Sequence, residues 1–293
     1  MRSAIDRGSE YEGATGLWSI LKLAVSDWLR HRSPRLGAAL AYYSVFSLGP
    51  LLLIVTAIAG LIWGGEGARS SIVSQFRALV GESGGEAIEA MLQGASSSVA
   101  GGWSAVIGVS LLLVAAVGVV VQLKDALNTI FEVSEPKNPG AAWYVKVYGG
   151  AFAGILVLGF LLAVSLVLSA LLAAFSDRLT GSTTTSLLLS LINFAVSLGM
   201  LTLLFSMLFK WLPDRQLEWR DVWLGGFITA LMFNVGKSAI AWYIGTQGLE
   251  STYGAAASVV VLLIWVYYAS QILLFGAEIT QAHATHRQAA KAS

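Results

Sequence analysis

The sequence predicts an all-α integral membrane protein with six transmembrane helices, an outer amphipathic helical hairpin and an N-terminal interfacial helix. Three observations support this prediction. Hydrophobic residues make up 56% of the 293 residues and charged residues only 12%, about half the charged fraction of a soluble domain. The mean hydropathy of +0.72 requires an apolar surface as well as an apolar core. Lysine and arginine gather in alternate connections between the apolar segments.

Six stretches are long and apolar enough to cross a bilayer core of roughly 30 Å, which takes about 20 residues. In lipid, every backbone polar group must be paired within the segment, so these stretches are expected to be helices. Their predicted bounds are Leu36–Trp63, Trp103–Val121, Val147–Phe175, Leu187–Phe209, Val222–Tyr243 and Gly254–Ala277. Together they form a predicted transmembrane domain over 36–277.

The connections differ strongly in positive charge, and this difference sets the predicted orientation. Fourteen Lys and Arg residues lie in 1–35, 124–146, 210–221 and 278–293. Only three lie in 64–102, 176–186 and 244–253. Because cytoplasmic loops carry the excess of Lys and Arg, both termini are expected in the cytoplasm. The prediction thus includes a cytoplasmic arm at 1–35 and a cytoplasmic tail at 278–293.

The cytoplasmic arm contains an amphipathic segment that is too short to cross the membrane. Its apolar residues share one helical face: Leu17, Leu21, Val25, Trp28 and Leu29. Such a helix is expected to lie in the membrane interface. Ser33-Pro34 follows, and we expect the serine to cap the first span and the proline to occupy its first turn.

The first outer loop has the same character over 66–100. One apolar stripe consists of Ile72, Val73, Phe76, Leu79 and Val80, and a second of Ala87, Ile88, Met91 and Leu92. Gly81, Gly84 and Gly85 lie between the stripes, so a periplasmic helical hairpin is predicted. The hairpin either covers the outer end of the bundle or acts as a gate.

Lys237 is an ionisable residue inside the fifth predicted span, and such residues are usually functional. It lies roughly 9 Å below the outer end of the helix. Asn234 is one turn away on the same face, and Asn193 of the fourth span lies at a similar depth. The three side chains are predicted to form a polar cluster, unless Lys237 extends outward to the interface.

The first predicted span contains Gly49-Pro50 near its middle. Proline removes a backbone hydrogen bond and kinks a helix. Transporters often build their sites from a broken helix at mid-membrane, and here Tyr42, Tyr43 and Ser47 precede the break. The alternative is a static kink whose free carbonyl is satisfied by Ser47 and a neighbouring helix.

Glu278 follows the sixth span directly and continues the helical stripe of Tyr267, Gln271 and Leu274, which is expected to face the bundle. It should lie roughly 20 Å from Lys237 along the membrane normal, so the two cannot form an ion pair. We expect Glu278 either to have a structural role, bonding a neighbouring helix or a loop backbone, or to belong to the functional site.

No sequence motif indicates catalysis. The chain has no cysteine, and it contains no nucleotide-binding glycine loop and no HExxH zinc motif. We therefore expect a protein that is not an enzyme, with no catalytic residue, metal site or cofactor. The net charge of +1 argues against nucleic-acid partners and leaves membrane lipids as the expected ones. Small residues such as Gly150-x-x-x-Gly154 and Gly225-Gly226 permit close helix contacts, either within the chain or in a homo-oligomer.

Two segments resemble the YihY/BrkB family of bacterial inner-membrane proteins. They are 36–54, which contains LAYYSVFSLGP, and 253–278, which contains IWVYYASQILLFGAE. The run Asp125-Ala-Leu-Asn-Thr-Ile-Phe and the pair Asn234 and Lys237 also fit. The resemblance implies a six-helix inner-membrane protein and no catalytic residues. Some members are labelled virulence or serum-resistance factors. A former label, ribonuclease BN, is regarded as a misassignment, and one branch is linked to export of lipid A precursors.

The sequence therefore favours a transporter or flippase-like protein for an amphiphile or small solute, without ATP hydrolysis of its own. The alternative is a structural or assembly scaffold of the cell envelope that transports nothing. An intramembrane or RNA-directed enzyme is the third hypothesis, and no clustered carboxylates or paired histidines support it. The predicted substrate-binding residues are Tyr42, Tyr43, Ser47, Pro50, Asn193, Asn234, Lys237, Tyr267, Gln271 and Glu278.

Overall fold

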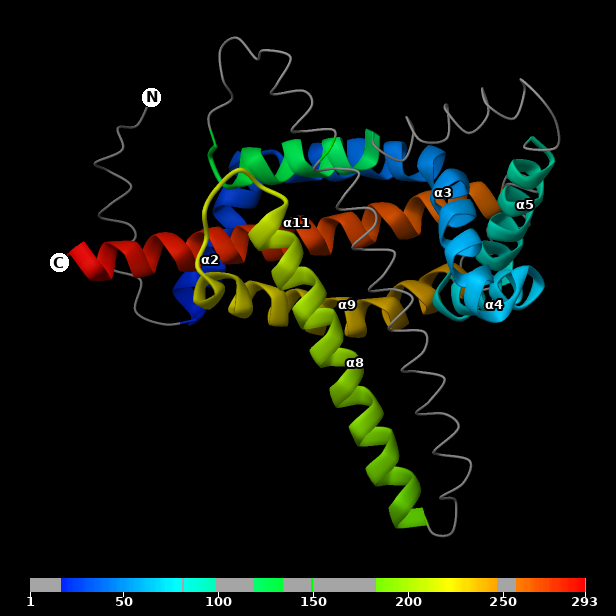
Figure 1. Ribbon diagram of the computed structural model, residues 1–293. Helices are drawn as coiled ribbons and strands as arrows, with labels where there is room; N and C mark the ends of the chain where they lie inside the picture. Colours follow the sequence, from blue (N-terminus) through cyan, green and yellow to red (C-terminus); the bar gives the residue numbers. More distant parts are fainter. Residues whose placement is uncertain are drawn as a thin grey trace.

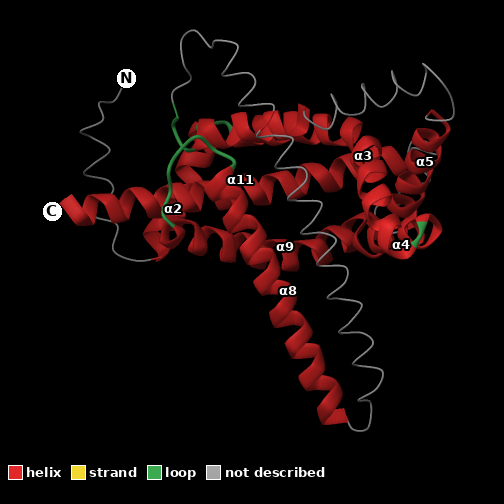
Figure 2. Cartoon of the chain, viewed as in Figure 1, coloured by secondary structure: helices red, strands yellow, loops and turns green. Residues whose placement is uncertain are grey.

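The computed structural model describes residues 17–80, 82–98, 118–133, 149, 183–246 and 257–292, and every regular element among them is an α-helix (Figure 2). The helices are α2 (Leu17–Arg30), α3 (Ser33–Trp63), α4 (Gly65–Val80), α5 (Glu82–Ser98), α8 (Thr183–Trp211), α9 (Trp219–Thr246) and α11 (Ala257–Ala292). A further helical segment covers 118–130. The helical class is confirmed. The second and third predicted spans lie almost entirely outside the described residues.

Helix α11 is the centre of the described structure, because α3 and α9 lie along opposite sides of it (Figure 1). Helix α8 packs chiefly against α9 and then extends away from the other described helices. By length and composition, two stretches in the described chain can cross a membrane, Phe194–Trp211 in α8 and Val259–Gln288 in α11. This helical architecture is consistent with a membrane protein.

The contact between α9 and α11 depends on a reciprocal pair of glycines and threonines. Gly225 of α9 lies against the hydroxyl of Thr280 on α11, and Gly276 of α11 lies against the hydroxyl of Thr229 on α9. Each threonine donates its hydroxyl hydrogen to the carbonyl of the glycine on its own helix, at 2.6 Å for Thr229 and 2.9 Å for Thr280. A side chain at either glycine would collide with the opposite helix. Small residues of this kind let membrane helices approach closely.

Gly226 provides the corresponding contact between α9 and α8. A Cβ atom there would overlap the hydroxyl of Ser206 and would lie 2.9 Å from the carbonyl oxygen of Thr202, both on α8. The adjacent glycines of α9 therefore face different partners, with Gly225 toward α11 and Gly226 toward α8. The predicted role of this pair in close helix packing is confirmed, and the contacts are within one chain.

Helix α3 is continuous from Ser33 to Trp63, but Figure 1 shows that its two halves run in different directions. The sequence places Gly49-Pro50 near the middle, and the hydrogen bond missing at the proline accounts for the bend. The first half runs along α11, and the second half leads to α4 and α5.

The helical hairpin predicted for 66–100 is formed by α4 and α5. The predicted stripes face inward: Ile72 and Val73 of α4 and Ile88 and Leu92 of α5 are buried together with Leu262 of α11. Gly84 and Gly85, which lie between the two stripes, belong to the first turn of α5, because this helix begins at Glu82. A Cβ at Gly85 would press on the side chain of Arg77, so this glycine serves hairpin packing.

Helix α2 packs on the last turns of α11. Ile20 and Ala24 of α2 are buried against Ile279 and Ala282. Helix α11 runs well past Ala277, so the segment predicted as a cytoplasmic tail continues the helix to Ala292. The large apolar side chains of α2 that do not meet α11 are exposed, namely Trp18, Val25 and Leu29. These three side chains give α2 an exposed apolar face.

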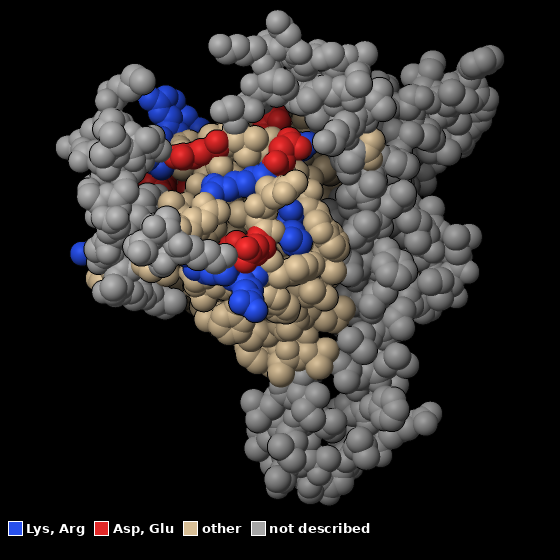
Figure 3. All heavy atoms as spheres, turned by 60° about the vertical axis from the view of Figure 1, so that its left-hand side comes forward, with Lys and Arg blue, Asp and Glu red and all other residues tan. Residues whose placement is uncertain are grey.

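Charged side chains gather at the end of the molecule that holds α2 and the connection between α8 and α9 (Figure 3). In that connection, Asp214 accepts hydrogen bonds from Lys124 (2.9 Å) and from the side-chain amide of Asn128 (3.1 Å). The backbone N–H of Asp214 donates to the side-chain oxygen of Asn128 at 2.9 Å. Asn128 thus ties the helix of 118–130 to the α8–α9 connection.

Replacing Asn128 by alanine is expected to lower the free energy of unfolding by about 2 kcal/mol, because two hydrogen bonds to Asp214 are lost at a buried position. Thermal unfolding of the detergent-solubilised protein measures this change. Thr129→Ala is the control, since the exposed Thr129 bonds only within its own helix. Equal melting of the two variants would contradict the role given to Asn128.

Candidate functional site

Glu278 on α11 is completely buried, and the turn between α2 and α3 supplies its hydrogen-bond partners. The Nδ1 atom of His31 lies 3.0 Å and 3.2 Å from the two carboxyl oxygens. The hydroxyl of Ser33 donates to the same carboxyl group at 3.0 Å. An ionised carboxylate only accepts hydrogen bonds, so with Glu278 ionised this geometry places a proton on Nδ1 of His31. Glu278 therefore bonds a neighbouring helix, which is the structural role that the sequence predicted as one possibility.

Ser33 does not act as the predicted helix cap. The residue that precedes α3 is Arg32, whose side chain makes no cap hydrogen bond, and Ser33 is the first residue of the helix. Because Pro34 occupies the first turn of α3, one backbone N–H that would need a cap is absent. The Ser33 hydroxyl is thus free to point at Glu278.

Two residues near Glu278 and His31 have a left-handed backbone conformation. Among the described residues, the non-glycine positions with positive φ are Arg32 (56°) and Glu132 (53°). Arg32 lies between the two residues that bond Glu278, and Glu132 accepts a hydrogen bond from Arg30 at 3.1 Å. Both strained positions therefore adjoin the same polar cluster. Left-handed backbone at non-glycine residues is uncommon and is often retained at functional sites.

The charges around His31 come from three elements. From α2, the carboxylate of Asp27 pairs with Arg30 at 3.0 Å, and a guanidinium nitrogen of Arg30 lies 3.3 Å from Nε2 of His31. From the turn that follows the helix of 118–130, Glu132 lies 3.7 Å from Nε2 of His31. From α11, Glu278 lies on the Nδ1 side. Burial lowers the pKa of His31, but the hydrogen bond and charge of Glu278 outweigh burial and raise the pKa above 6.5.

This raised pKa predicts that stability depends on pH. A histidine whose folded pKa exceeds its unfolded value of about 6.5 stabilises the fold fully below that value. The stabilisation is then lost as the pH rises through the folded pKa. We expect the melting temperature in detergent to fall as the pH is raised from 6 upward, and His31→Gln to flatten that dependence. An unchanged pH profile in His31→Gln would contradict this assignment.

Gln271 lies further along the same contact between α3 and α11. Its side-chain amide touches Gly37 of α3, and neither its nitrogen nor its oxygen has a hydrogen-bond partner in the described chain. Tyr267, the next member of the predicted stripe, is 38% exposed. The structure therefore places Glu278 and Gln271 on one seam, which we call the α3–α11 seam, formed by Ser33 and Gly37 of α3 against Gln271 and Glu278 of α11.

The predicted cluster around Lys237 is not formed by the side chains that the structure describes. Asn234 is buried and donates to the carbonyl of Ala230 on its own helix at 3.0 Å. Lys237 is partly exposed and has no hydrogen bond or ion pair within the described residues. The side chain of Asn193 lies outside the described residues. Because α11 lies between α9 and α3, Lys237 is also separated from the α3–α11 seam.

The predicted residues of α3 have two different environments. Tyr42 and Tyr43 are 59% and 45% exposed, and the ring of Tyr42 lies 4.9 Å from that of Phe46. Ser47 is buried and donates to the carbonyl of Ser44 at 3.1 Å, so its hydroxyl is satisfied within α3. The side chain of Pro50 lies outside the described residues. The tyrosines are not part of the α3–α11 seam.

Sequence reasoning missed His31 and Ser33. Ser33 lies 245 residues from Glu278 in the chain, and no periodic pattern links the two. One available signal was the position of His31, Ser33 and Glu278 at the same predicted depth, at the cytoplasmic ends of the first and sixth spans. No group of three His, Cys, Asp or Glu side chains suited to a metal ion occurs in the part of the chain that the structure describes.

Comparison with known proteins agrees with this picture of a helical membrane protein. The family model described as virulence factor BrkB matches residues 24–293. A UPF0761 membrane protein of Pseudomonas paraeruginosa is 31% identical over 250 residues, covering 84% of this chain and 58% of the relative. One of Alcanivorax borkumensis is 26% identical over 247 residues, covering 84% and 56%. The chain thus spans somewhat more than half of these relatives' length. No solved structure matches.

The matched region begins within α2 and includes the turn with His31 and Ser33, the bent helix α3, the hairpin and all of α11. It therefore contains both sides of the α3–α11 seam and every residue of the predicted site. The chain belongs to the BrkB family of membrane proteins.

Proposed function

We propose that this protein is a flippase-like transporter that moves an amphiphile or small solute across the bacterial inner membrane. In this proposal the chain crosses the membrane six times, both termini lie in the cytoplasm, and the hairpin of α4 and α5 lies on the outer side. The Lys and Arg bias of the connections supports this orientation. The membrane class of the relatives supports the location.

The observation that carries the proposal is the complete burial of Glu278 at the end of the α3–α11 seam. A buried carboxylate is costly inside a membrane domain, and such residues commonly belong to ion, proton or substrate pathways. Its partners come from the turn that leads into the first half of α3, and α3 bends near its middle. Release of Glu278 would let that half of α3 move against α11 and open the seam on the cytoplasmic side.

Transport can be tested with purified protein in vesicles of phosphatidylethanolamine and phosphatidylglycerol that contain NBD-labelled phosphatidylethanolamine. Dithionite destroys only the label in the outer leaflet, so it reports movement of lipid between leaflets. We expect the wild-type protein to expose inner-leaflet label faster than protein-free vesicles, and His31→Gln and Glu278→Gln to slow this step. Glu66→Gln, on the exposed start of α4, is the matched carboxylate control.

The alternative function is a scaffold for cell-envelope assembly. One observation favours it: α8 packs chiefly against α9 and extends away from the other described helices, so these helices cover only part of its surface. If wild-type vesicles behave like protein-free vesicles in the dithionite assay, transport of phosphatidylethanolamine is excluded and this alternative is preferred.

A further inference from the structure

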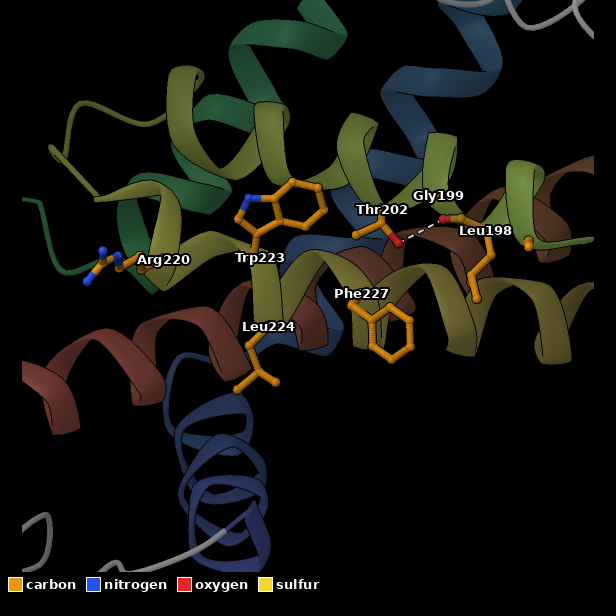
Figure 4. Close-up of a pocket in the computed structure, with 8 residues that line it drawn as sticks. Leu198, Gly199, Thr202, Arg220, Trp223, Leu224 and Phe227 are labelled. Atoms are coloured by element: carbon orange, nitrogen blue, oxygen red, sulfur yellow. Dashed lines mark hydrogen bonds between the residues drawn. The ribbon is translucent and has the colours of Figure 1, made fainter.

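A groove of about 590 Å³ lies between α8 and α9, away from the α3–α11 seam. Figure 4 shows its residues as two facing rows, with Leu198, Gly199 and Thr202 on α8 and Trp223 and Phe227 on α9. The volume is in the range of pockets that hold small molecules. Most of the lining is apolar, and the groove is open on one side.

The groove exists because the contact at Gly226 brings α8 and α9 together at one level, while Gly199 leaves space on the open side. A Cβ atom at Gly199 would meet no atom within 4 Å. The hydroxyl of Thr202 is already bonded to the carbonyl of Leu198 at 2.7 Å, so it requires no ligand. The interior of the groove thus suits a hydrocarbon chain better than a polar solute.

Arg220 lies at the end of the groove nearest the α8–α9 connection (Figure 4). Its side chain is exposed and has no hydrogen bond or ion pair with the described residues. The neighbouring carboxylates Glu218 and Asp221 both pair with Arg287, so neither neutralises Arg220. The groove therefore combines an apolar channel with an unpaired cation at one end.

Aromatic residues place this cation at the level of lipid headgroups. Trp211 and Trp219 are exposed beside the groove, with ring centres 5.9 Å apart. Tryptophan is enriched at the two membrane–water interfaces. Lys210 lies over the Trp219 ring at 5.4 Å, and its ammonium group is bound to the carbonyl of Leu217. Among the residues that line the groove, Arg220 is the cation available to a ligand.

We infer that the α8–α9 groove binds an anionic phospholipid of the inner leaflet, with its phosphate on Arg220 and an acyl chain along Phe227 and Gly199. Basic positions between transmembrane helices on the cytoplasmic side recognise anionic headgroups. This site is separate from Glu278 and goes beyond the proposed function, because lipid binding here requires no transport.

Native mass spectrometry of the full chain, released from nanodiscs that contain phosphatidylglycerol, tests the inference. The wild-type protein is expected to retain one phosphatidylglycerol in preference to phosphatidylcholine. Arg220→Gln should reduce the retained fraction about fivefold, the factor for one basic residue at an anionic surface. Gly199→Phe should abolish retention by filling the groove, from a position where an added Cβ atom meets no atom within 4 Å. Because the inferred site lies between α8 and α9, substitutions outside this groove should leave the retained fraction unchanged.

Two variants serve as matched controls. Arg35→Gln removes another exposed arginine near the start of a helix, and Leu231→Phe adds an aromatic ring to an exposed position of α9 outside the groove. Both should retain the lipid like the wild type. Equal loss in the controls, or no loss in Arg220→Gln and Gly199→Phe, would overturn the inference. The inference would also be overturned if the wild-type protein were a dimer that Gly199→Phe dissociates. In that case a second copy of the chain, and not a lipid, would occupy the groove.

Discussion

Replacement of Glu278 by alanine is expected to lower the free energy of unfolding by about 3 to 5 kcal/mol, the usual effect of removing one member of a buried charged pair. The substitution leaves the ring of His31 and the hydroxyl of Ser33 without their acceptor at a position that has no solvent contact. It also detaches the α2–α3 turn from α11. The measurement is thermal or denaturant unfolding of the protein in a mild detergent.

The charge and the hydrogen bonds of Glu278 can be separated with a second variant. Glu278→Gln keeps an oxygen that accepts a hydrogen bond from Ser33, so we expect a smaller loss of stability than in the alanine variant. Glu66→Gln, on the exposed first turn of α4, should unfold like the wild type. An alanine variant as stable as the wild type would show that the burial of Glu278 contributes nothing to the fold.

The second large effect is expected at the contact between α9 and α11. Gly276→Ala should destabilise the protein by about 2 kcal/mol, because the added methyl group overlaps the hydroxyl of Thr229 and overpacks the interface. Removal of that hydroxyl in the double variant Gly276→Ala/Thr229→Ala should restore part of the loss. A double-mutant cycle on unfolding free energies measures this coupling.

Gly199→Ala is the matched control for the glycine substitution. Its added methyl group meets no atom within 4 Å, and alanine is the better helix former, so its stability should equal or exceed that of the wild type. If the cycle shows no coupling between Gly276 and Thr229, the two helices do not pack as described here.

Sequence patterns predicted those elements whose signal is local. The apolar stripes of 66–100 predicted which residues of the hairpin are buried, since a helix has a period of 3.6 residues and these stripes follow it. The length and hydropathy of 187–209 and 222–243 located α8 and α9 to within a few residues. The helical continuation of α11 beyond Ala277 was harder to predict, because polar residues replace the apolar pattern there.

The candidate site was predictable only in part, because sequence gives the depth of a residue more readily than the direction in which it points. Glu278 was recognised as a bundle-facing residue, but its partners lie on a turn 245 residues or more away along the chain. Asn234 and Lys237 both lie on α9, yet Asn234 bonds its own helix. Ser33 has the sequence of a helix cap, and tertiary contact with Glu278 overrides that local preference.

Membrane topology is the claim on which both the cytoplasmic position of Glu278 and the inner-leaflet lipid site depend. The chain has no cysteine, so single introduced cysteines are its only thiols. Ser74→Cys on α4 and Gln216→Cys in the α8–α9 connection both lie at exposed positions. A membrane-impermeant maleimide applied to spheroplasts should label Ser74→Cys at once and Gln216→Cys only after the membrane is permeabilised. Labelling of Gln216→Cys in intact spheroplasts, with Ser74→Cys protected, would contradict the account.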